Sequence, residues 1–210
     1  YFSDRIEITS KASIVIGARY DSYELKPSVD ELFNRSNVAR IALSYIDDSA
    51  VSGKLGFIYD VTDSLSVFAQ YAEGFRSPDY ESANISFTNF AFFYSVAPNP
   101  NLDSEESDGY EIGLRGDNVF GSSRVNWSFV YYENDYEDFI DTQITGRTPR
   151  GITIYQYVNL NNVTIDGFEI EAQALLNDNY SLYFGYSNSD GEQNGEKLIS
   201  IDPDQTILGL

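Results

Sequence analysis

Apolar and polar residues alternate one by one along many short stretches of this chain, and no other feature restricts its fold as strongly. In residues 12–20, for example, Ala12, Ile14 and Ile16 take every second position. Because successive side chains of a β-strand point to opposite faces of a sheet, this period predicts strands with one apolar and one mixed face. Further strands are expected in residues 54–59, 65–71, 110–115, 125–132, 152–160, 165–175 and 180–186, with one more possible in residues 38–46.

Composition also favours strands over helices. The chain contains 17 tyrosines, 14 phenylalanines and 15 glycines, and aromatic side chains fit pleated sheets well. It contains no cysteine and no histidine, which removes disulfide bonds, thiolate metal sites and the commonest general base. The sequence also lacks a Gly-x-Ser-x-Gly motif and a glycine-rich phosphate loop. We therefore predict an all-β protein that is not an enzyme.

Acidic residues outnumber basic ones by 33 to 13, which gives a formal net charge of -20. A surface of this charge repels phosphate backbones, so we expect no nucleic-acid partner. Acidic runs such as Asp47-Asp48, 103–106 and 133–135 could be simply solvated or could attract Ca²⁺, although none has the spacing of an EF-hand loop. The sequence leaves that choice open, and no metal site of the protein's own is predicted.

The segments between the predicted strands alternate between long and short. Long polar segments cover residues 22–51, 75–104, 140–152 and 188–198, and short turns cover residues 9–11, 60–64, 117–123 and 176–179. Outer-membrane barrels have this asymmetry, with short periplasmic turns and longer external loops. Tyrosines near the predicted strand ends fit the aromatic girdle of such barrels; they are Tyr20, Tyr71, Tyr131 and Tyr186. The pattern thus favours an antiparallel up-and-down transmembrane β-barrel.

Alternation by itself fits two architectures equally well. In a membrane barrel the apolar face meets lipid, and charged residues such as Glu111, Arg115 and Glu169 line a wet lumen. In a soluble β-sandwich the apolar faces pack together, with Trp127 and Phe168 in a shared core, and the same charges point to water. The second hypothesis is therefore a soluble, acidic β-sandwich or adhesin-like module that binds a carbohydrate or a protein.

The longest aromatic-rich segment lies between two turn motifs. Gly74-Phe75-Arg76-Ser77-Pro78 precedes it and Asn99-Pro100-Asn101-Leu102 follows it, and proline and asparagine favour turns at both places. The residues between them include Phe87, Phe90 and Phe92. Long loops in compact domains are usually functional or disordered, and so many aromatic side chains favour a function. The sequence therefore predicts a ligand-binding loop over residues 75–104.

A series of motifs along nearly the whole chain resembles the barrel of TonB-dependent outer-membrane receptors. The matching residues are Phe2-Ser3-Asp4, Gly17-Ala18-Arg19-Tyr20-Asp21, Tyr71-Ala72-Glu73-Gly74-Phe75-Arg76-Ser77-Pro78, Asn99-Pro100-Asn101-Leu102, Glu105, Tyr110-Glu111-Ile112-Gly113-Leu114-Arg115, Tyr136-Glu137-Asp138-Phe139-Ile140 and Gly167-Phe168-Glu169-Ile170-Glu171. The paired Phe-Arg-x-Pro and Asn-Pro-Asn-Leu motifs look most like the haem and haemoglobin receptors of this family. Looser versions of both motifs occur in its siderophore receptors.

The resemblance implies a barrel of about 22 strands with a plugged lumen, of which this chain would hold about 9–11 strands. Residues 1–210 would be part of one barrel domain in the outer membrane of a Gram-negative bacterium, in contact with lipid. The chain starts without methionine or a signal peptide, and we expect a piece that lacks the plug, the TonB-box and the C-terminal strand. The whole receptor would import a ferric siderophore or haem, as cargo and not as a cofactor, with energy delivered by TonB through the plug.

The resemblance also implies which residues hold the ligand. Those expected to fix the base and shape of the loop are Phe75, Arg76, Pro78, Asn99, Pro100, Asn101, Leu102 and Glu105, and those expected to contact an apolar ligand are Phe90, Phe92, Phe93, Tyr94 and Tyr80. The haem receptors are expected to have a ligating histidine between the two motifs, and residues 79–98 contain none. Tyr80 and Tyr94 could ligate ferric iron through a phenolate, or they could simply pack within the loop. Haem and a ferric siderophore therefore remain open as ligands.

Overall fold

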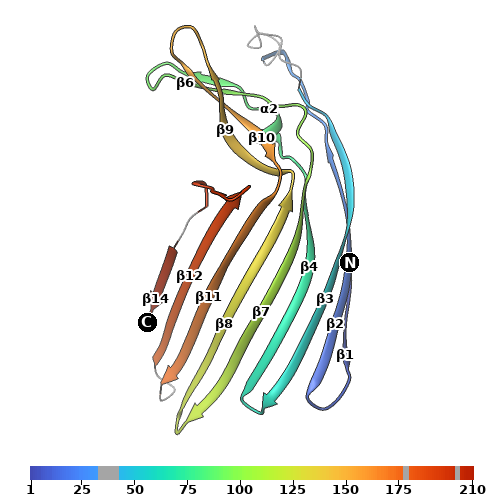
Figure 1. Ribbon diagram of the computed structural model, residues 1–210, viewed down its shortest axis with the longest axis vertical. Helices are drawn as coiled ribbons and strands as arrows, with labels where there is room; N and C mark the ends of the chain where they lie inside the picture. The colour runs from blue at the N-terminus through green and yellow to red at the C-terminus, as the bar shows by residue number, and fades with distance from the viewer. Residues whose placement is uncertain (33–42, 177–179, 202–203) are drawn as a thin grey trace.

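The computed structural model describes residues 1–32, 43–176, 180–201 and 204–210. Ten of its strands form one antiparallel sheet (Figure 1), in the order β1-β2-β3-β4-β7-β8-β11-β12-β13, with β14 also paired to β12. The strands are β1 (Phe2–Glu7), β2 (Ala12–Leu25), β3 (Ile46–Thr62), β4 (Leu65–Arg76), β7 (Glu105–Phe120), β8 (Ser123–Glu137), β11 (Val163–Leu176), β12 (Tyr180–Gln193), β13 (Glu196–Lys197) and β14 (Asp204–Gly209). The up-and-down order and the strand number agree with the predicted partial barrel.

A second, smaller sheet lies at one end of the main sheet, opposite the short turns (Figure 1). It has four strands in the order β5-β6-β10-β9, which we call the loop sheet. The segment between β4 and β7 supplies α2 (Tyr80–Asn84), β5 (Phe87–Asn89) and β6 (Tyr94–Ala97), and the segment between β8 and β11 supplies β9 (Phe139–Arg147) and β10 (Thr153–Leu160). β6 pairs with β10 in parallel, and the other neighbours are antiparallel. Two segments far apart in the sequence thus share one sheet.

The strands of the main sheet are longer than the hydrophobic pattern indicates. β2 continues to Leu25 and β3 starts at Ile46, so both ends of the long segment predicted over residues 22–51 belong to strands. Most of the segment predicted over 140–152 is likewise part of β9. Backbone hydrogen bonds can continue where side chains are polar on both faces, so alternation ends before the strand does. Of the possible strand over residues 38–46, residues 38–42 lie outside the described residues, and Ile46 begins β3.

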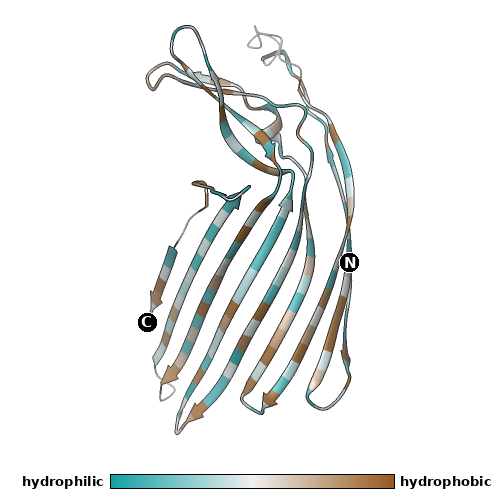
Figure 2. Cartoon of the chain, in the orientation of Figure 1, coloured by the Kyte–Doolittle hydropathy of each residue, from teal (hydrophilic) through white to brown (hydrophobic). Residues whose placement is uncertain are grey.

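Cross-strand partners lie on the same face of a sheet, so the pairing shows how the two faces differ. One row joins Ile14 to Phe57, Ala69, Ile112, Tyr131 and Phe168. The neighbouring row on the other face joins Gln70, Glu111, Tyr132 and Gly167. Figure 2 shows the resulting alternation of brown and teal along each strand. One face of the main sheet is therefore apolar and the other is polar or mixed, as predicted.

No second sheet of the described residues covers the apolar face. Ile112 is 54% exposed and Phe57 is 46% exposed. Phe168 packs sideways, with its ring 6.2 Å from that of Phe129 and 5.6 Å from that of Tyr186 on the neighbouring strands. The hypothesis of a soluble β-sandwich is therefore wrong, because it required Trp127 and Phe168 to share a buried core. In the described residues, no helix is long and apolar enough to span a membrane.

A small hydrophobic core lies where the main sheet meets the loop sheet. Leu160, Val163 and Leu198 are buried there, and Tyr136 and Phe139 pack against them with their rings 5.2 Å apart. Tyr136, Phe139, Leu160 and Val163 lie where the chain leaves β8 for β9 and enters β11 from β10, and Leu198 directly follows β13. The core thus fixes the hairpin of β9 and β10, which we call the second hairpin, on the end of the main sheet.

On the polar face, an aromatic ring covers a glycine of the next strand. Phe68 lies opposite Gly113 in the β4–β7 pair, and the Arg115 guanidinium lies 4.7 Å from the centre of the Phe68 ring. A Cβ atom on Gly113 would lie 2.4 Å from Phe68 Cζ and 2.8 Å from the Phe129 carbonyl oxygen. Only a residue without a side chain fits here.

We expect Gly113→Ala to destabilise the protein by about 1–3 kcal/mol, because the added methyl group must displace backbone as well as a ring. Gly146→Ala in β9 is the matched control, since its Cβ would meet nothing closer than 3.9 Å. That change should alter stability by less than about 0.5 kcal/mol. Urea unfolding followed by Trp127 fluorescence measures both, and equal effects of the two changes would contradict the packing described.

Candidate functional site

The segment between β4 and β7 is closed at its base by an ion pair. Arg76 and Glu105 are the last cross-strand partners of the β4–β7 ladder, and Arg76 Nη2 lies 2.7 Å from Glu105 Oε2. Glu105 is only 7% exposed. A buried carboxylate is costly unless it is paired, so this contact ties the two ends of the loop firmly together.

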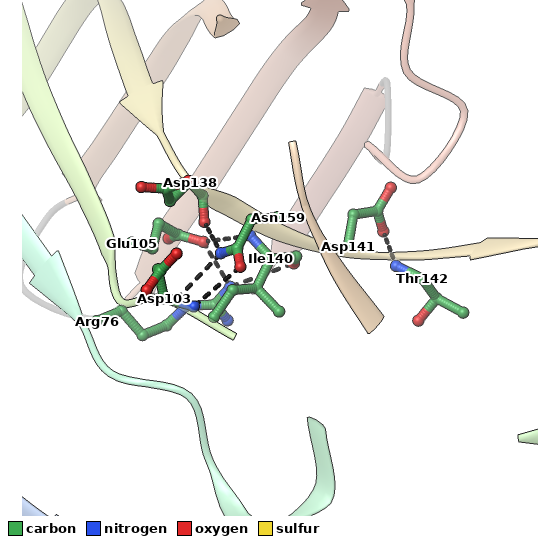
Figure 3. Close-up of polar contacts among 8 residues, drawn as sticks. All are labelled: Arg76, Asp103, Glu105, Asp138, Ile140, Asp141, Thr142 and Asn159. Atoms are coloured by element: carbon green, nitrogen blue, oxygen red, sulfur yellow. Dashed lines mark hydrogen bonds and ion pairs between the residues drawn. The ribbon is translucent and has the colours of Figure 1, made fainter. Parts of the chain in front are cut away.

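The same carboxylate also holds the second hairpin. The Ile140 amide donates a hydrogen bond to Glu105 Oε2 at 3.0 Å, and Arg76 Nη2 donates to the Ile140 carbonyl at 3.4 Å. Figure 3 shows these three residues, which we call the base latch, gathered at one point. The latch joins the end of β4, the start of β7 and the start of β9.

Asn159 of β10 strengthens this junction from the other side. Its Nδ2 donates to the carbonyls of Asp103 and Asp138 at 3.0 and 2.7 Å, and its Oδ1 accepts from the Asp103 amide at 2.9 Å (Figure 3). Asp138 has φ = 54°, a left-handed conformation that turns the chain sharply between β8 and β9. One amide side chain therefore satisfies backbone groups of both loops.

The Asn-Pro-Asn motif is attached to β10. Asn99 Nδ2 donates to the Tyr157 carbonyl at 2.9 Å, and Asn99 Oδ1 accepts from the Asn101 amide at 3.1 Å. Gln156 Nε2 donates to the Pro98 carbonyl at 2.8 Å. The motif therefore bends the chain and fastens it to the second hairpin, while the neighbouring Leu102 is half-buried.

Pro78 begins the other side of the loop and is fully buried, while Phe75 before it is half-buried. Asp79 caps the short helix α2 by accepting from the Ser82 amide at 2.7 Å. This bond lowers the pKa of the Asp79 carboxyl below its usual value, because it stabilises the charged form. Tyr80 follows on the first turn and is 48% exposed.

An exposed aromatic tip joins β5 to β6. Phe90, Phe92 and Phe93 are 72%, 77% and 61% exposed, and we call them the aromatic tip. Asn89 Oδ1 accepts from the amides of Ala91 and Phe92 at 3.1 and 3.2 Å, which shapes the turn. The turn is thus held by its own hydrogen bonds while its phenyl rings face solvent.

Tyr94 differs from the aromatic tip because its ring is already packed. It lies edge-on to Phe87 at 5.6 Å and to Tyr155 at 6.1 Å, measured between ring centres. Tyr94 is the partner of Thr153 in the parallel β6–β10 pair, and the Thr153 amide donates to the Phe93 carbonyl at 2.9 Å. The aromatic tip is therefore anchored to β10 directly beside it.

Sequence reasoning missed the second hairpin as part of this site. The motif residue Ile140 and the strand over 152–160 were recognised, yet no pattern in them indicates a contact with residues 76–105. Asn159 and Tyr155 reach the loop only because β10 pairs with β6, some sixty residues earlier in the chain. Such long-range pairing leaves no local signal.

Two carboxylates of the acidic runs take part in contacts between segments of the chain. In the described residues, no group of three or more Asp and Glu side chains is arranged to hold a metal ion. Glu105 is paired with Arg76, and Asp48 accepts a hydrogen bond from Ser104. These carboxylates hold loops together.

Comparison with protein families decides what kind of barrel this is. A family model described as "TonB dependent receptor-like, beta-barrel" matches residues 1–210. The chain belongs to this family. Its relatives are receptors and transporters rather than enzymes, and the resemblance found in the motifs is confirmed.

Two relatives of this chain have names that refer to different ligands. "Probable hemoglobin and hemoglobin-haptoglobin-binding protein 4" of Haemophilus influenzae is 24% identical over all of this chain and 26% of its own length. The "Ferripyoverdine receptor" of Pseudomonas aeruginosa is also 24% identical over all of this chain and 23% of its own length. The chain thus spans about a quarter of the length of these relatives.

Solved structures show the same fold. One titled "Copper transporter OprC" superposes with a TM-score of 0.66 at 18% identity, covering 95% of this chain and 30% of that one. At this identity the likeness concerns the fold, and it agrees with a sheet that is part of a larger barrel.

We expect Glu105→Ala to loosen both loops at once, because it removes the partner of Arg76 and the acceptor of the Ile140 amide. Loss of a buried charged acceptor costs about 1–3 kcal/mol. Amide hydrogen exchange should therefore speed up in residues 77–104 and also in 139–160. Asp21→Ala is the control, because its ion pair with Arg19 is more exposed. Faster exchange in residues 77–104 alone would contradict the shared latch.

We expect α2 to lose protection in acid. The folded pKa of Asp79 is lowered, so its contribution is complete above the unfolded pKa of about 3.9 and is lost as the pH falls below it. Hydrogen exchange of residues 80–85, corrected for the intrinsic rate, should stay constant from pH 6 to about pH 4 and rise as the pH falls further, through the folded pKa of Asp79. Asp79→Asn should remove this pH dependence, because asparagine caps helices without titrating. An unchanged pH dependence in that variant would contradict the assignment.

Proposed function

We propose that this chain is part of an outer-membrane receptor that imports an iron complex, and that the two fastened hairpins bind the complex on the outer side. The observation that carries the proposal is the aromatic tip. Three phenyl rings face solvent on a turn held by hydrogen bonds, although exposing such rings is unfavourable in water. Exposed apolar groups of this kind mark contact sites for ligands or partners.

The two faces of the main sheet support a position in a membrane. The apolar face would meet lipid, and the opposite face, with Glu111 and Arg115, would line the lumen. The Tyr71 hydroxyl donates a hydrogen bond to Glu73 at 3.2 Å, and the Tyr131 hydroxyl donates one to Glu133 at 3.3 Å. In both pairs the glutamate lies two residues nearer the loop sheet than the tyrosine. The apolar face thus passes from tyrosines to carboxylates, as expected where lipid gives way to water.

The tyrosines assigned to an aromatic girdle from the sequence lie farther from the strand ends than predicted. Tyr71 and Tyr131 are several residues from the ends of β4 and β8, because these strands continue past the apolar belt. This arrangement supports placing the loop sheet outside the membrane, raised above its surface on strand extensions. Transport would then need the plug and the TonB protein, as the family resemblance implies.

The ligand is proposed to be an iron complex with its own chelator, such as haem or a ferric siderophore. One relative is named for haemoglobin binding and the other for ferripyoverdine. The segment between the two motifs has no histidine, and the Tyr94 ring packs between Phe87 and Tyr155. These features favour contacts between the aromatic tip and the body of the complex over direct ligation of iron by the loop.

The test uses the full-length receptor in cells that lack other routes for the same iron source. We expect replacement of residues 84–97 by a Gly/Ser linker, or Phe90→Ser, Phe92→Ser and Phe93→Ser together, to abolish growth at limiting concentrations. Affinity should fall about tenfold or more, since aromatic contacts are worth roughly 1 kcal/mol each and 1.4 kcal/mol is tenfold.

Phe120→Ser is the matched control, because Phe120 is 66% exposed at the short-turn end of β7. It should leave growth and binding unchanged. Surface amounts of all variants are compared by antibody. Normal growth of the linker variant on haem and on ferric siderophores would refute the assignment of the loop.

A further inference from the structure

We propose that Arg147 and Arg150 form a cationic rim beside the aromatic tip, and that the two together select an iron complex with an aromatic body and anionic groups. The inference rests on the proposed function and deepens it. It concerns the turn between β9 and β10, to which neither the motifs nor the named relatives assign a role.

Basic side chains are scarce in this chain, and several are already engaged. Of the 46 charged residues only 13 are Lys or Arg, by the count of 33 acidic and 13 basic residues. Ion pairs within the described residues are Arg19–Asp21, Lys26–Glu24, Arg76–Glu105, Arg124–Asp117 and Lys197–Asp190. By contrast, Arg147 and Arg150 have no ion pair or side-chain hydrogen bond there, and both are exposed. Their charges are available to a ligand.

The pairing of three strands places Arg147 two strands away from Tyr94, the residue that directly follows the aromatic tip. Arg147 is the partner of Thr153 in the β9–β10 pair, and Thr153 is the partner of Tyr94 in the β10–β6 pair. Two strand spacings separate the Cα atoms of Arg147 and Tyr94, which is about 10 Å. Figure 1 shows the turns of both hairpins at the same end of the loop sheet.

The turn that carries Arg150 is held by its own hydrogen bonds. The Thr148 amide donates to the Ile152 carbonyl and the Gly151 amide to the Thr148 carbonyl, both at 2.9 Å. Thr148 Oγ1 accepts from the Ile152 amide at 3.1 Å, and Gly151 has φ = 80°, which glycine adopts without strain. Arg150 is thus presented on a fixed turn, and ordering it on binding costs little backbone entropy.

The combination of groups indicates the chemistry of the ligand. Phenyl rings pack on a flat apolar body, and guanidinium groups bind carboxylates or other oxyanions through paired hydrogen bonds. A protein with a net charge of -20 repels anions at long range. Local positive charge at the tip is therefore needed for an anionic complex, whereas a neutral or cationic complex would gain nothing from it.

The test measures binding to the full-length receptor in detergent with four probes. The first pair is haem, which carries two carboxylates, and its dimethyl ester, which carries none. The second pair is an anionic ferric catecholate and a neutral ferric hydroxamate. In the double variant Arg147→Gln with Arg150→Gln, we expect the affinity for the anionic probe of whichever pair binds to fall about tenfold. The affinity for the neutral probe of that pair should stay unchanged. Added salt should weaken anion binding by the wild type more than by this variant.

Controls separate charge from structure and from the proposed function. Arg147→Lys with Arg150→Lys should recover part of the affinity, and Arg124→Gln at the short-turn end should have no effect. Equal loss for neutral and anionic probes, or no loss for either, would overturn the cationic rim while leaving an iron-complex receptor intact. Failure of the wild type to bind any of the four probes would contradict the proposed function itself, and this inference with it.

Discussion

A slip of one residue between two neighbouring strands would move every apolar side chain of one strand to the polar face. Such a slip would disturb many pairs at once in the main sheet, because its strands pair over long stretches, as in the fourteen consecutive pairs of β11 with β12 from Val163–Gln193 to Leu176–Tyr180. Close packing across strands, such as Phe68 over Gly113, adds a second restriction on register. The separation of an apolar and a polar face depends on this ladder, and so does any placement of the sheet in a membrane.

The loops inherit their geometry from the same ladder. Arg76 and Glu105 are the final pair of β4 and β7, so the ion pair that closes the first loop is placed by strand register. From this point the Ile140 amide and the Asn159 side chain bring in the second hairpin. The main sheet therefore positions the base latch, and the base latch positions the loop sheet. The turns at the far end of the loop sheet expose the aromatic tip together with Arg147 and Arg150.

The sequence predicted the class of fold well, because alternation reflects a local property of strands. Ile14, Phe57 and Ile112 show which face is apolar without knowledge of their partners. Strand ends were predicted poorly, since polar segments such as residues 21–25 continue the ladder through backbone bonds that leave no mark on hydropathy. At the candidate site, the two turn motifs indicated a loop whose base is fixed at both ends. The contacts of Asn99 with Tyr157 and of Glu105 with Ile140 could not be predicted, because they join segments whose proximity only the fold creates.

The parallel pairing of β6 with β10 has a consequence for how such receptors can diversify. Each strand supplies backbone hydrogen-bond partners to the other, because residues 94–97 of β6 pair with residues 153–156 of β10. A residue inserted into one of these two strands would shift its pairing by one position and turn its own side chains beyond that point to the opposite face of the loop sheet. The two hairpins therefore form one inherited unit. A change of cargo by exchange of loops between related receptors would require transferring both segments together, although residues 98–152, which include β7 and β8 of the main sheet, separate β6 from β10 along the chain.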